Sequence, residues 1–338
     1  MSNFFEAPIV REGRVNRKPI IMAHPLTIVT IGELLVEFVS HTRGCALERI
    51  GSYSGPYPSG APAIFLDQAA RMGSSTAIYG SVGNDGFGRG LLKRLREDGV
   101  DTSGIEVHSD LTTGTAFVSY YDDGSRDFIY HMIGTAADRL TFDVASLPEG
   151  ELVLHVSAAS LGSPPLRAAL LDAVDAVLAR GGRISCDPNA RPELMRDQAA
   201  RDALDGIIAK SFCLMPSTSD LGFLFPGLSE ADAVERLLAS SAEIVALKRG
   251  AEGATVAGHG ERHNFTSHPV EEIDPTGAGD AFCGTFVSLI CQGASLHEAG
   301  RLANAAGAIA VTRRGPMEGN STPDEIAAFL SAREGAAG

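Results

Sequence analysis

The stretch "ELVLHVSAASLGSPPLRAALLDAVDAVLARGGRISCDPN" at residues 151–189 decides the fold class of this chain. It opens with a short apolar run, continues into a helical segment over 165–180, and closes with a second apolar run at 182–189. The same alternation continues through the segments 195–210, 212–217, 229–239 and 243–250. Strands that alternate with helices predict an α/β fold with a doubly wound, mostly parallel central sheet. Such sheets bind their ligands beyond the carboxyl ends of the strands.

The segments on either side of this stretch extend the pattern and add two hairpins. A buried first strand is predicted at 26–39, emerging at Gly32. The segment 114–132 is more polar and aromatic, and its two β-rich runs flank Asp122, Asp123 and Gly124, which predicts a hairpin appended to the sheet. The other predicted elements are helices at 62–72, 85–100, 279–292, 295–312 and 323–333, a strand at 75–83, and a hairpin at 253–265.

Composition and charge limit the partners and the compartment of this protein. The 338 residues are 44% hydrophobic and 21% charged, which is typical of soluble globular proteins. A net charge of −14 repels nucleic acid and anionic membranes, and no apolar run is long enough to span a bilayer, so neither partner is expected. The five cysteines form no CxxC pair, which favours a reducing, cytoplasmic location. We expect residues 1–25 to form a polar N-terminal extension without the apolar run of a signal peptide.

The segment "IDPTGAGDAF" at residues 273–282 carries the strongest functional signal. Gly277, Ala278 and Gly279 leave their backbone amides unobstructed at the start of an apolar helix, whose N-terminus carries about half a positive charge. Such a turn binds anions. Asp280 follows directly, so a carboxylate can accept a proton from a hydroxyl while the amides hold the charge on a phosphoryl group. The pattern indicates a site for a hydroxyl and a polyphosphate.

The longer segment "DPTGAGDAFCGTF" (274–286) resembles the C-terminal signature of the PfkB (ribokinase-like) carbohydrate kinases. Seven other segments also resemble that family, at 32–38, 58–73, 80–88, 112–118, 187–191, 246–254 and 302–308. The resemblance covers about residues 26–333. It implies a ribokinase-like three-layer α/β/α fold with a small β-sheet lid over the sugar. The core would comprise 26–37, 59–110 and 136–333, and the lid 38–58 and 111–135.

The resemblance also implies roles for residues of the phosphate end of the site. Asp280 would be the general base, with Gly277, Ala278 and Gly279 as the anion hole, and Asp274 and Thr276 would shape the turn. ATP would be the phosphate donor, brought with Mg²⁺. Whether a K⁺ ion binds near Asp274 is left open. The family's N-x-x-E, associated with Mg²⁺-bound water and phosphate, is here Ser217 to Asp220, so Asp220 would contact the metal indirectly. The implied ATP contacts are Ser217, Lys248, Gly250, Gly277, Gly279 and Asn304.

At the sugar end the resemblance implies a second set of contacts, with departures from the family pattern. Ile64 stands where the family has an asparagine that binds sugar hydroxyls, so that contact is lost or moved. Arg191 would reach toward the sugar or the γ-phosphate, and Asp280 would meet the reacting hydroxyl. The implied sugar-binding residues are Glu37, Gly60, Ile64, Tyr130, Met132, Arg191 and Asp280.

The substrate preference follows from the lid. Fructokinases, tagatose kinase-like members and 2-keto-3-deoxygluconate kinases are the most similar subgroups, and the last use a lid arginine for the substrate carboxylate. This chain has Met132 at that place, and a thioether cannot pair with a carboxylate, so a neutral ketohexose such as fructose or tagatose is favoured. Because Arg126 could reach in from the hairpin, 2-keto-3-deoxygluconate remains the alternative.

Two further alternatives stay open, and two others are disfavoured. Ile64 and Ser217 leave open a sugar or nucleotide sensor with weak catalysis, and a nucleoside kinase is a rival within the enzymes. Gly83, Asp85 and Gly88 do not form GxGxxG, and GxxxxGK[ST] is absent, which disfavours a dinucleotide dehydrogenase and a P-loop enzyme. The resemblance also implies a homodimer through the lid edges.

Overall fold

The structure is a computed structural model, and it describes residues 26–122, 125–190 and 197–334. Within these residues the core sheet has nine strands in the order β13-β12-β11-β10-β9-β8-β1-β4-β5. All pair in parallel except β12 and β13, which form an antiparallel hairpin at one edge. The strands are β1 (Leu26–Ile31), β4 (Ser75–Gly83), β5 (Asp101–His108), β8 (Glu151–Ser157), β9 (Arg183–Asp187), β10 (Cys213–Leu214), β11 (Ile244–Lys248), β12 (Ala254–Gly258) and β13 (Glu261–Phe265).

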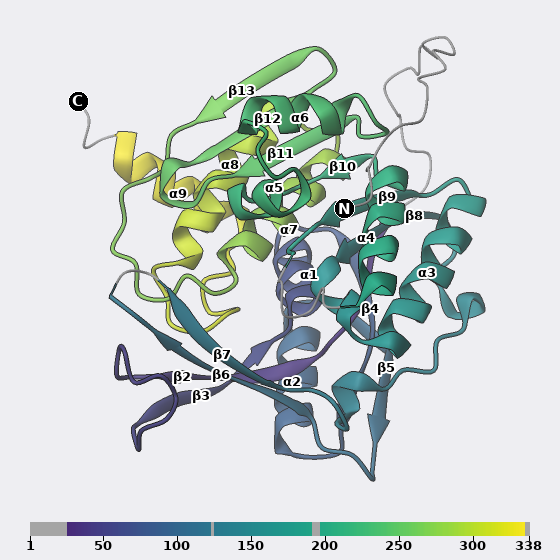
Figure 1. Cartoon of the computed structure of the whole chain (residues 1–338), viewed down its shortest axis with the longest axis vertical. Helices are drawn as coiled ribbons and strands as arrows, with labels where there is room; N and C mark the ends of the chain where they lie inside the picture. The colour runs from purple at the N-terminus through teal and green to yellow at the C-terminus, as the bar shows by residue number, and fades with distance from the viewer. Residues whose placement is uncertain (1–25, 123–124, 191–196, 335–338) are drawn as a thin grey trace.

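Helices cover both faces of this sheet (Figure 1), as the strand–helix alternation predicts. Side chains alternate between the two faces of a strand, so Val29 packs in one core and Ile28 in the other. The helices are α1 (Ala61–Arg71), α2 (Gly86–Glu97), α3 (Pro164–Ala179), α4 (Gln198–Lys210), α5 (Thr218–Leu224), α6 (Glu230–Leu238), α7 (Ala278–Cys291), α8 (Leu296–Ala310) and α9 (Pro323–Glu334). The first core lies under α3 to α6, and the second lies under α1, α2, α7 and α8.

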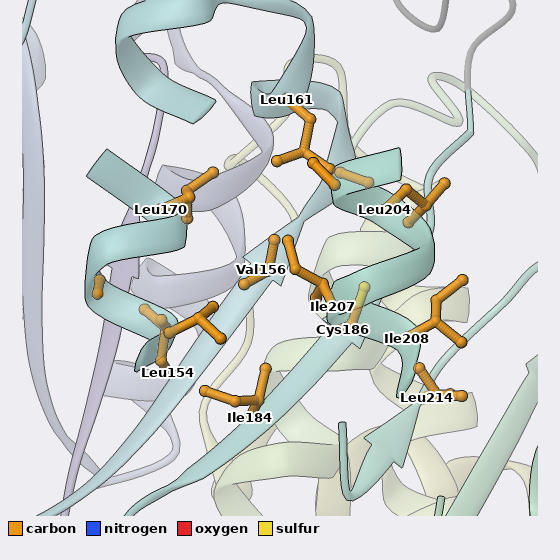
Figure 2. Packing of buried hydrophobic residues seen from close by; sticks show 14 of the residues in the cluster. Leu154, Val156, Leu161, Leu170, Ile184, Cys186, Leu204, Ile207, Ile208 and Leu214 are labelled. Atoms are coloured by element: carbon orange, nitrogen blue, oxygen red, sulfur yellow. The ribbon is translucent and has the colours of Figure 1, made fainter. Parts of the chain in front are cut away.

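The first core shows how the opening stretch of sequence folds. Figure 2 shows side chains of β8 and β9, including Val156 and Cys186, meeting Leu170 of α3 and Leu204 and Ile207 of α4. These side chains are buried, and removal of this apolar surface from water is the main force that holds the helices on the sheet. Strand β8 pairs with both β9 and β1, so the order reverses between β8 and β1. A reversal of this kind opens a ligand crevice beyond the strand ends.

A second, smaller sheet forms the lid, in the order β3-β2-β6-β7 (Figure 1). Its strands are β2 (Leu35–Ser40), β3 (Tyr53–Ser59), β6 (Gly114–Tyr120) and β7 (Arg126–His131). Strands β6 and β7 form the predicted antiparallel hairpin, although Asp123 and Gly124 of its turn lie outside the described residues. Beneath this sheet the N-cap Asp85 of α2 accepts hydrogen bonds from the backbone N–H and Oγ1 of Thr113, both at 2.8 Å. This contact fixes the start of the lid hairpin on the core.

The structure corrects the prediction of one strand at 26–39. The segment divides into β1 in the core sheet and β2 in the lid, and the backbone N–H of Gly32 donates to the carbonyl of Tyr79 at 3.0 Å between them. Both halves are equally apolar, so hydrophobic pattern does not show the break. Strand β3 lies mostly in the segment 38–58 that the resemblance assigns to the lid, whereas β5 lies in a segment for which no strand is predicted. No described helix combines the length and the apolar character that crossing a membrane would require.

Candidate active site

A cavity of about 1110 Å³ lies between the lid and the carboxyl ends of the core strands. It gathers residues from distant parts of the sequence, including Glu37 of the lid, Asn189 after β9 and Lys248 at the end of β11. The residues expected from the sequence that line it are Glu37, Gly60, Ile64, Tyr130, Met132, Ser217, Asp220, Lys248, Gly250, Gly277, Ala278, Gly279, Asp280 and Asn304. Arg191 lies outside the described residues, and Asp274 is buried behind the cavity wall.

The anion turn (residues 274–279) starts helix α7. Gly277 caps this helix with a φ of 81°, and a Cβ there would lie 2.1 Å from the carbonyl oxygen of Pro316. Only glycine fits this position without strain. Gly279 is different, because a Cβ there would lie at an ordinary 3.6 Å from Nζ of Lys248. The first amides of a helix have no partner within it, and here the Ala278 N–H makes only a long bond of 3.4 Å to the Pro275 carbonyl, so the start of α7 can still donate to an anion in the cavity.

Asp280 occupies the first turn of α7, where the helix dipole favours a negative charge. Its side chain is half-buried and lines the cavity beside the anion turn. Ile64 of α1 contacts the same turn, since its Cγ2 lies 3.2 Å from the place of a Cβ on Gly277. A carboxylate, open helix amides and an apolar side chain therefore meet at one corner of the cavity.

Asp274 holds the anion turn to the lid. Its Oδ1 accepts from the hydroxyl of Tyr120 at 2.5 Å and from the backbone N–H of Thr276 at 3.0 Å. Its Oδ2 accepts from the backbone N–H of Gly315 at 2.9 Å. Burial and the Asp274 carboxylate raise the pKa of the Tyr120 phenol, so this hydroxyl stays protonated and donates. Among the described residues, no group of three or more His, Cys, Asp or Glu side chains is placed to hold a metal ion.

Lys248 and Asp187 form a buried ion pair next to the anion turn. The Lys248 ammonium contacts Asp187 Oδ2, and it lies 3.5 Å from the Cys283 thiol. Burial alone would lower the pKa of Lys248, but the Asp187 carboxylate outweighs it and the pKa is raised. Burial raises the pKa of Cys283 well above its usual value, so its thiol stays protonated. The site thus holds a permanent cation at its phosphate end.

Asp220 has a structural role in addition to lining the cavity. It forms a capping box with Ser217 at the start of α5, where its Oδ2 accepts from the backbone N–H of Ser217 at 2.7 Å and from the Ser217 hydroxyl at 2.6 Å. Its Oδ1 accepts from the backbone N–H of Ala190 at 2.7 Å. Because three protein donors already engage this carboxylate, it fits contact with a metal through water better than direct ligation.

The lid end of the cavity combines carboxylates with apolar and aromatic walls. Glu33 Oε2 accepts from the Ser160 hydroxyl at 2.5 Å, and Glu37 Oε2 accepts from the Ser59 hydroxyl at 3.4 Å. On β7 the rings of Phe128 and Tyr130 stack at 5.2 Å, and the Arg126 guanidinium lies 4.8 Å from the Phe128 ring centroid. These carboxylates can accept hydrogen bonds from hydroxyl groups, while the rings offer a face to the carbon skeleton of a ligand.

Three residues for which the sequence predicts no specific role also lie in the site. Asp187 is at the predicted carboxyl end of a strand, but its pairing with Lys248 depends on strand order. Glu33 lines the cavity just after β1, and the sequence pattern already places it at the active end of the first strand, although without a role. His268 lines the far end near Asn304, whose Nδ2 donates to the carbonyl of Thr266 at 2.8 Å. Burial and the nearby Arg333 and Arg301 lower the pKa of His268.

An α/β core, a β lid and a carboxylate beside open helix amides define an enzyme of the phosphotransferase class. Residues 26–323 match the pfkB family of carbohydrate kinases, and the chain belongs to that family. Fructokinase-1 of Oryza sativa subsp. japonica is 32% identical over 88% of this chain and 95% of its own length. The protein is therefore a sugar kinase, and its acceptor group is a sugar hydroxyl.

Solved structures give the same assignment. A provisionally named ribokinase II from E. coli, in complex with ATP and Mg²⁺, has a TM-score of 0.85 and 41% identity, covering 90% of this chain and 99% of its own. A double mutant of the fructokinase from Vibrio cholerae O395, bound to fructose, ADP and a potassium ion, has a TM-score of 0.77 and 26% identity, with 90% and 98% coverage. The ribokinase-like three-layer fold with a lid, expected from the sequence, is confirmed.

Proposed function

We propose that this sugar kinase transfers the γ-phosphoryl group of ATP to a hydroxyl of a neutral ketohexose, fructose or tagatose. Asp280 is the general base, and the amides of 277–279 are the anion hole. The observation that carries this proposal is the position of Asp280 in the first turn of α7, in a cavity that the lid and the core share. The named ligands of the two similar structures, ATP with Mg²⁺ and fructose with ADP, support the same pairing of substrates.

In the proposed reaction the acceptor oxygen attacks the γ-phosphorus in line, and its proton passes to the Asp280 carboxylate. The bond from the γ-phosphorus to the bridging oxygen breaks, and its electron pair stays on the departing ADP. The α7 amides hold the charge on the migrating group. Mg²⁺ brought by ATP would neutralise phosphate charge, with Ser217 and Asp220 contacting its water. The lid excludes bulk water from the cavity.

The preference for a neutral ketohexose rests on the lid end of the cavity. Met132 at the lid end and Ile64 beside the anion turn offer no partner for a carboxylate, whereas Glu33 and Glu37 accept hydrogen bonds from hydroxyls and repel an acid. Arg126 supports the alternative of 2-keto-3-deoxygluconate, because its guanidinium also lines the cavity. Measuring the rate of ADP release with fructose, tagatose, 2-keto-3-deoxygluconate and nucleosides as acceptors separates these substrates. ADP release that no acceptor stimulates, despite sugar binding, would instead support a sensor.

Asp280→Asn tests the catalytic assignment itself. We expect this variant to bind ADP as the wild type does and to lose turnover by about 100-fold or more, since a positioned base contributes about 10²–10⁴-fold. Near-normal turnover would refute Asp280 as the base.

We further propose K⁺ binding near Asp274, because its buried carboxylate would offset the charge of a monovalent cation. Equal rates in potassium and in tetramethylammonium chloride would exclude this site.

We also propose a homodimer through the lid and a cytoplasmic location. On the outer face of the lid the rings of Phe38 and Phe117 stack with their centroids 5.1 Å apart. Ile129, which pairs with Phe117 in the sheet, is 52% exposed. Apolar side chains on an exposed sheet with unpaired edges favour association. Light scattering of the wild type and of Ile129→Glu tests the dimer. The cytoplasmic location is supported by the free thiols of all five cysteines.

A further inference from the structure

The phosphate end of the cavity needs a cation, because the protein carries a net charge of −14 and its substrate is a polyanion. Among the described residues that line the cavity, Arg126, Lys248 and His268 are the basic side chains. Arg126 lies over the Phe128 ring in the lid. His268 has a lowered pKa and is neutral near pH 7. Lys248 is therefore the cation that stands beside the anion turn.

The position of Lys248 relative to Gly279 is the key geometric observation. A Cβ on Gly279 would lie 3.6 Å from Nζ, so the ammonium faces the first turn of α7 across the space that glycine leaves open. An ammonium has three N–H donors. Two partners engage it, Asp187 Oδ2 and Cys283 Sγ at 3.5 Å. One donor thus remains for a ligand in the cavity.

Asp187 is placed to hold this ammonium and not to compete for the substrate. Its side chain is 4% exposed, against 13% for Lys248, so the carboxylate is the deeper member of the pair. Its Oδ1 accepts from the backbone N–H of Asn189 at 3.1 Å, which fixes the carboxylate at the end of β9. The backbone N–H of Lys248 donates to the carbonyl of Pro216 at 2.8 Å, which fixes the end of β11. Strands β9 and β11 thereby fix the position of the Lys248 ammonium.

We infer that Lys248 is a catalytic residue of phosphoryl transfer, donating to the migrating phosphoryl group from the side of Gly279, and that Asp187 is its positioning residue. This inference rests on the proposed function. Lys248 keeps its proton throughout: the acceptor proton goes to Asp280, and the electron pair of the breaking bond goes to ADP. The role of Lys248 is to oppose charge that spreads over the equatorial oxygens in the transition state.

The test compares Lys248→Met and Lys248→Arg with a matched surface variant. Lys210→Met removes a lysine that also pairs with an aspartate, Asp175 at 2.7 Å, but lies outside the cavity. We expect Lys248→Met to lower kcat by about 100-fold or more, as removal of an oxyanion donor does, with the Kd of ADP within about threefold of wild type. Lys248→Arg should recover part of kcat because it retains the charge. Lys210→Met should match the wild type.

A second readout does not depend on turnover. Aluminium fluoride mimics the transferring phosphoryl group, so in the presence of acceptor it should tighten ADP binding to the wild type by tenfold or more in calorimetry. Lys248→Met should lose this tightening. If kcat stays within threefold of wild type, or if only the Kd of ADP rises, Lys248 is not catalytic. If the unpaired Asp187 prevents folding of Lys248→Met, the double variant Lys248→Met with Asp187→Asn removes both charges, and the same outcomes decide.

The two proposals fail in distinguishable ways. A wild type that phosphorylates none of the sugars contradicts the proposed function, and the inference about Lys248 falls with it. A wild type that is active, with Lys248→Met equally active and equally responsive to aluminium fluoride, contradicts the inference alone.

Discussion

At the scale of the residue, the two glycines of the anion turn have different physical reasons to be glycine. Gly277 has a φ of 81°, and its Cβ would lie 2.1 Å from the carbonyl oxygen of Pro316, so a side chain there conflicts with the backbone. Gly279 is helical, and its Cβ would lie at an allowed 3.6 Å from Lys248 Nζ. The backbone conformation therefore requires the first glycine, whereas the proposed chemistry requires the second.

Alanine substitution at each glycine separates these two requirements. Gly277→Ala should lower the free energy of unfolding by about 1–3 kcal/mol, because a non-glycine residue in this backbone region is strained. Gly279→Ala should leave stability unchanged or slightly higher, since alanine favours the helix, yet lower kcat by about tenfold or more by filling the space before Lys248. Urea unfolding and steady-state rates check both variants. Equal loss of stability in the two would contradict the distinction.

Residue roles that depend on local order were predictable from the sequence, and roles that depend on pairing were not. The anion turn and Asp280 follow one another within 274–280, so the pattern alone placed them together at a helix start. Asp187 and Lys248 are 61 positions apart and meet because β9, β10 and β11 are neighbours. No spacing rule in the sequence indicates that contact.

At the scale of the element, a buried carboxylate joins α1 and α2 to the C-terminal segment. Asp67 of α1 is fully buried; its Oδ2 accepts from Asn320 Nδ2 at 2.7 Å and lies 3.5 Å from Nη2 of Arg94. Burial raises the pKa of Asp67 to about 7, the Arg94 charge opposes this, and Asp98 adds to the rise. Asp67 therefore binds its proton far more tightly in the folded chain than in the unfolded one.

The raised pKa of Asp67 determines whether the free energy of unfolding rises or falls with pH. Since the folded pKa is about 7 against a usual 3.8, the folded chain holds more protons between these values, and stability falls as pH rises from about 4 to 7. Between pH 5 and pH 8, we expect the free energy of unfolding of the wild type to fall by about 3 kcal/mol relative to Asp67→Asn. Urea titrations of both proteins at these pH values give the difference directly. Parallel pH profiles would show that Asp67 does not titrate as described.

Element boundaries show where hydrophobic pattern stops being sufficient. The elements of 151–189 were predictable because a 16-residue helix lies between two short, buried apolar runs. The division of 26–39 depends on pairing with distant segments: β1 pairs with β4 and β8 in the core sheet, and β2 pairs with β3 and β6 in the lid. Strand β5 has the sequence "DTSGIEVH" and is an edge strand of the sheet. Its polar side chains and central glycine do not match the apolar pattern of a buried strand, so the sequence does not predict it.

At the scale of the whole molecule, the lid and the phosphate end of the site are joined by one buried contact. Tyr120 ends strand β6 of the lid, and its hydroxyl reaches Asp274 at 2.5 Å and also contacts Thr276 Oγ1. Asp274 in turn holds the backbone of the anion turn through Thr276 and Gly315. A shift of the lid sheet would therefore be transmitted to the start of α7, so that the anion hole is best formed when the lid is in place.

Tyr120→Phe tests this coupling, and the neighbouring residue provides its control. Loss of the hydroxyl leaves a buried carboxylate oxygen with one donor fewer, which costs about 1–3 kcal/mol of stability. If the lid positions the anion turn, kcat should also fall by about tenfold. Tyr121→Phe removes a hydroxyl that donates to Asp127 within the lid, so its kcat should stay at the wild-type value. Equal rates for the two variants, measured where both are fully folded, would mean that the anion turn keeps its shape without the lid.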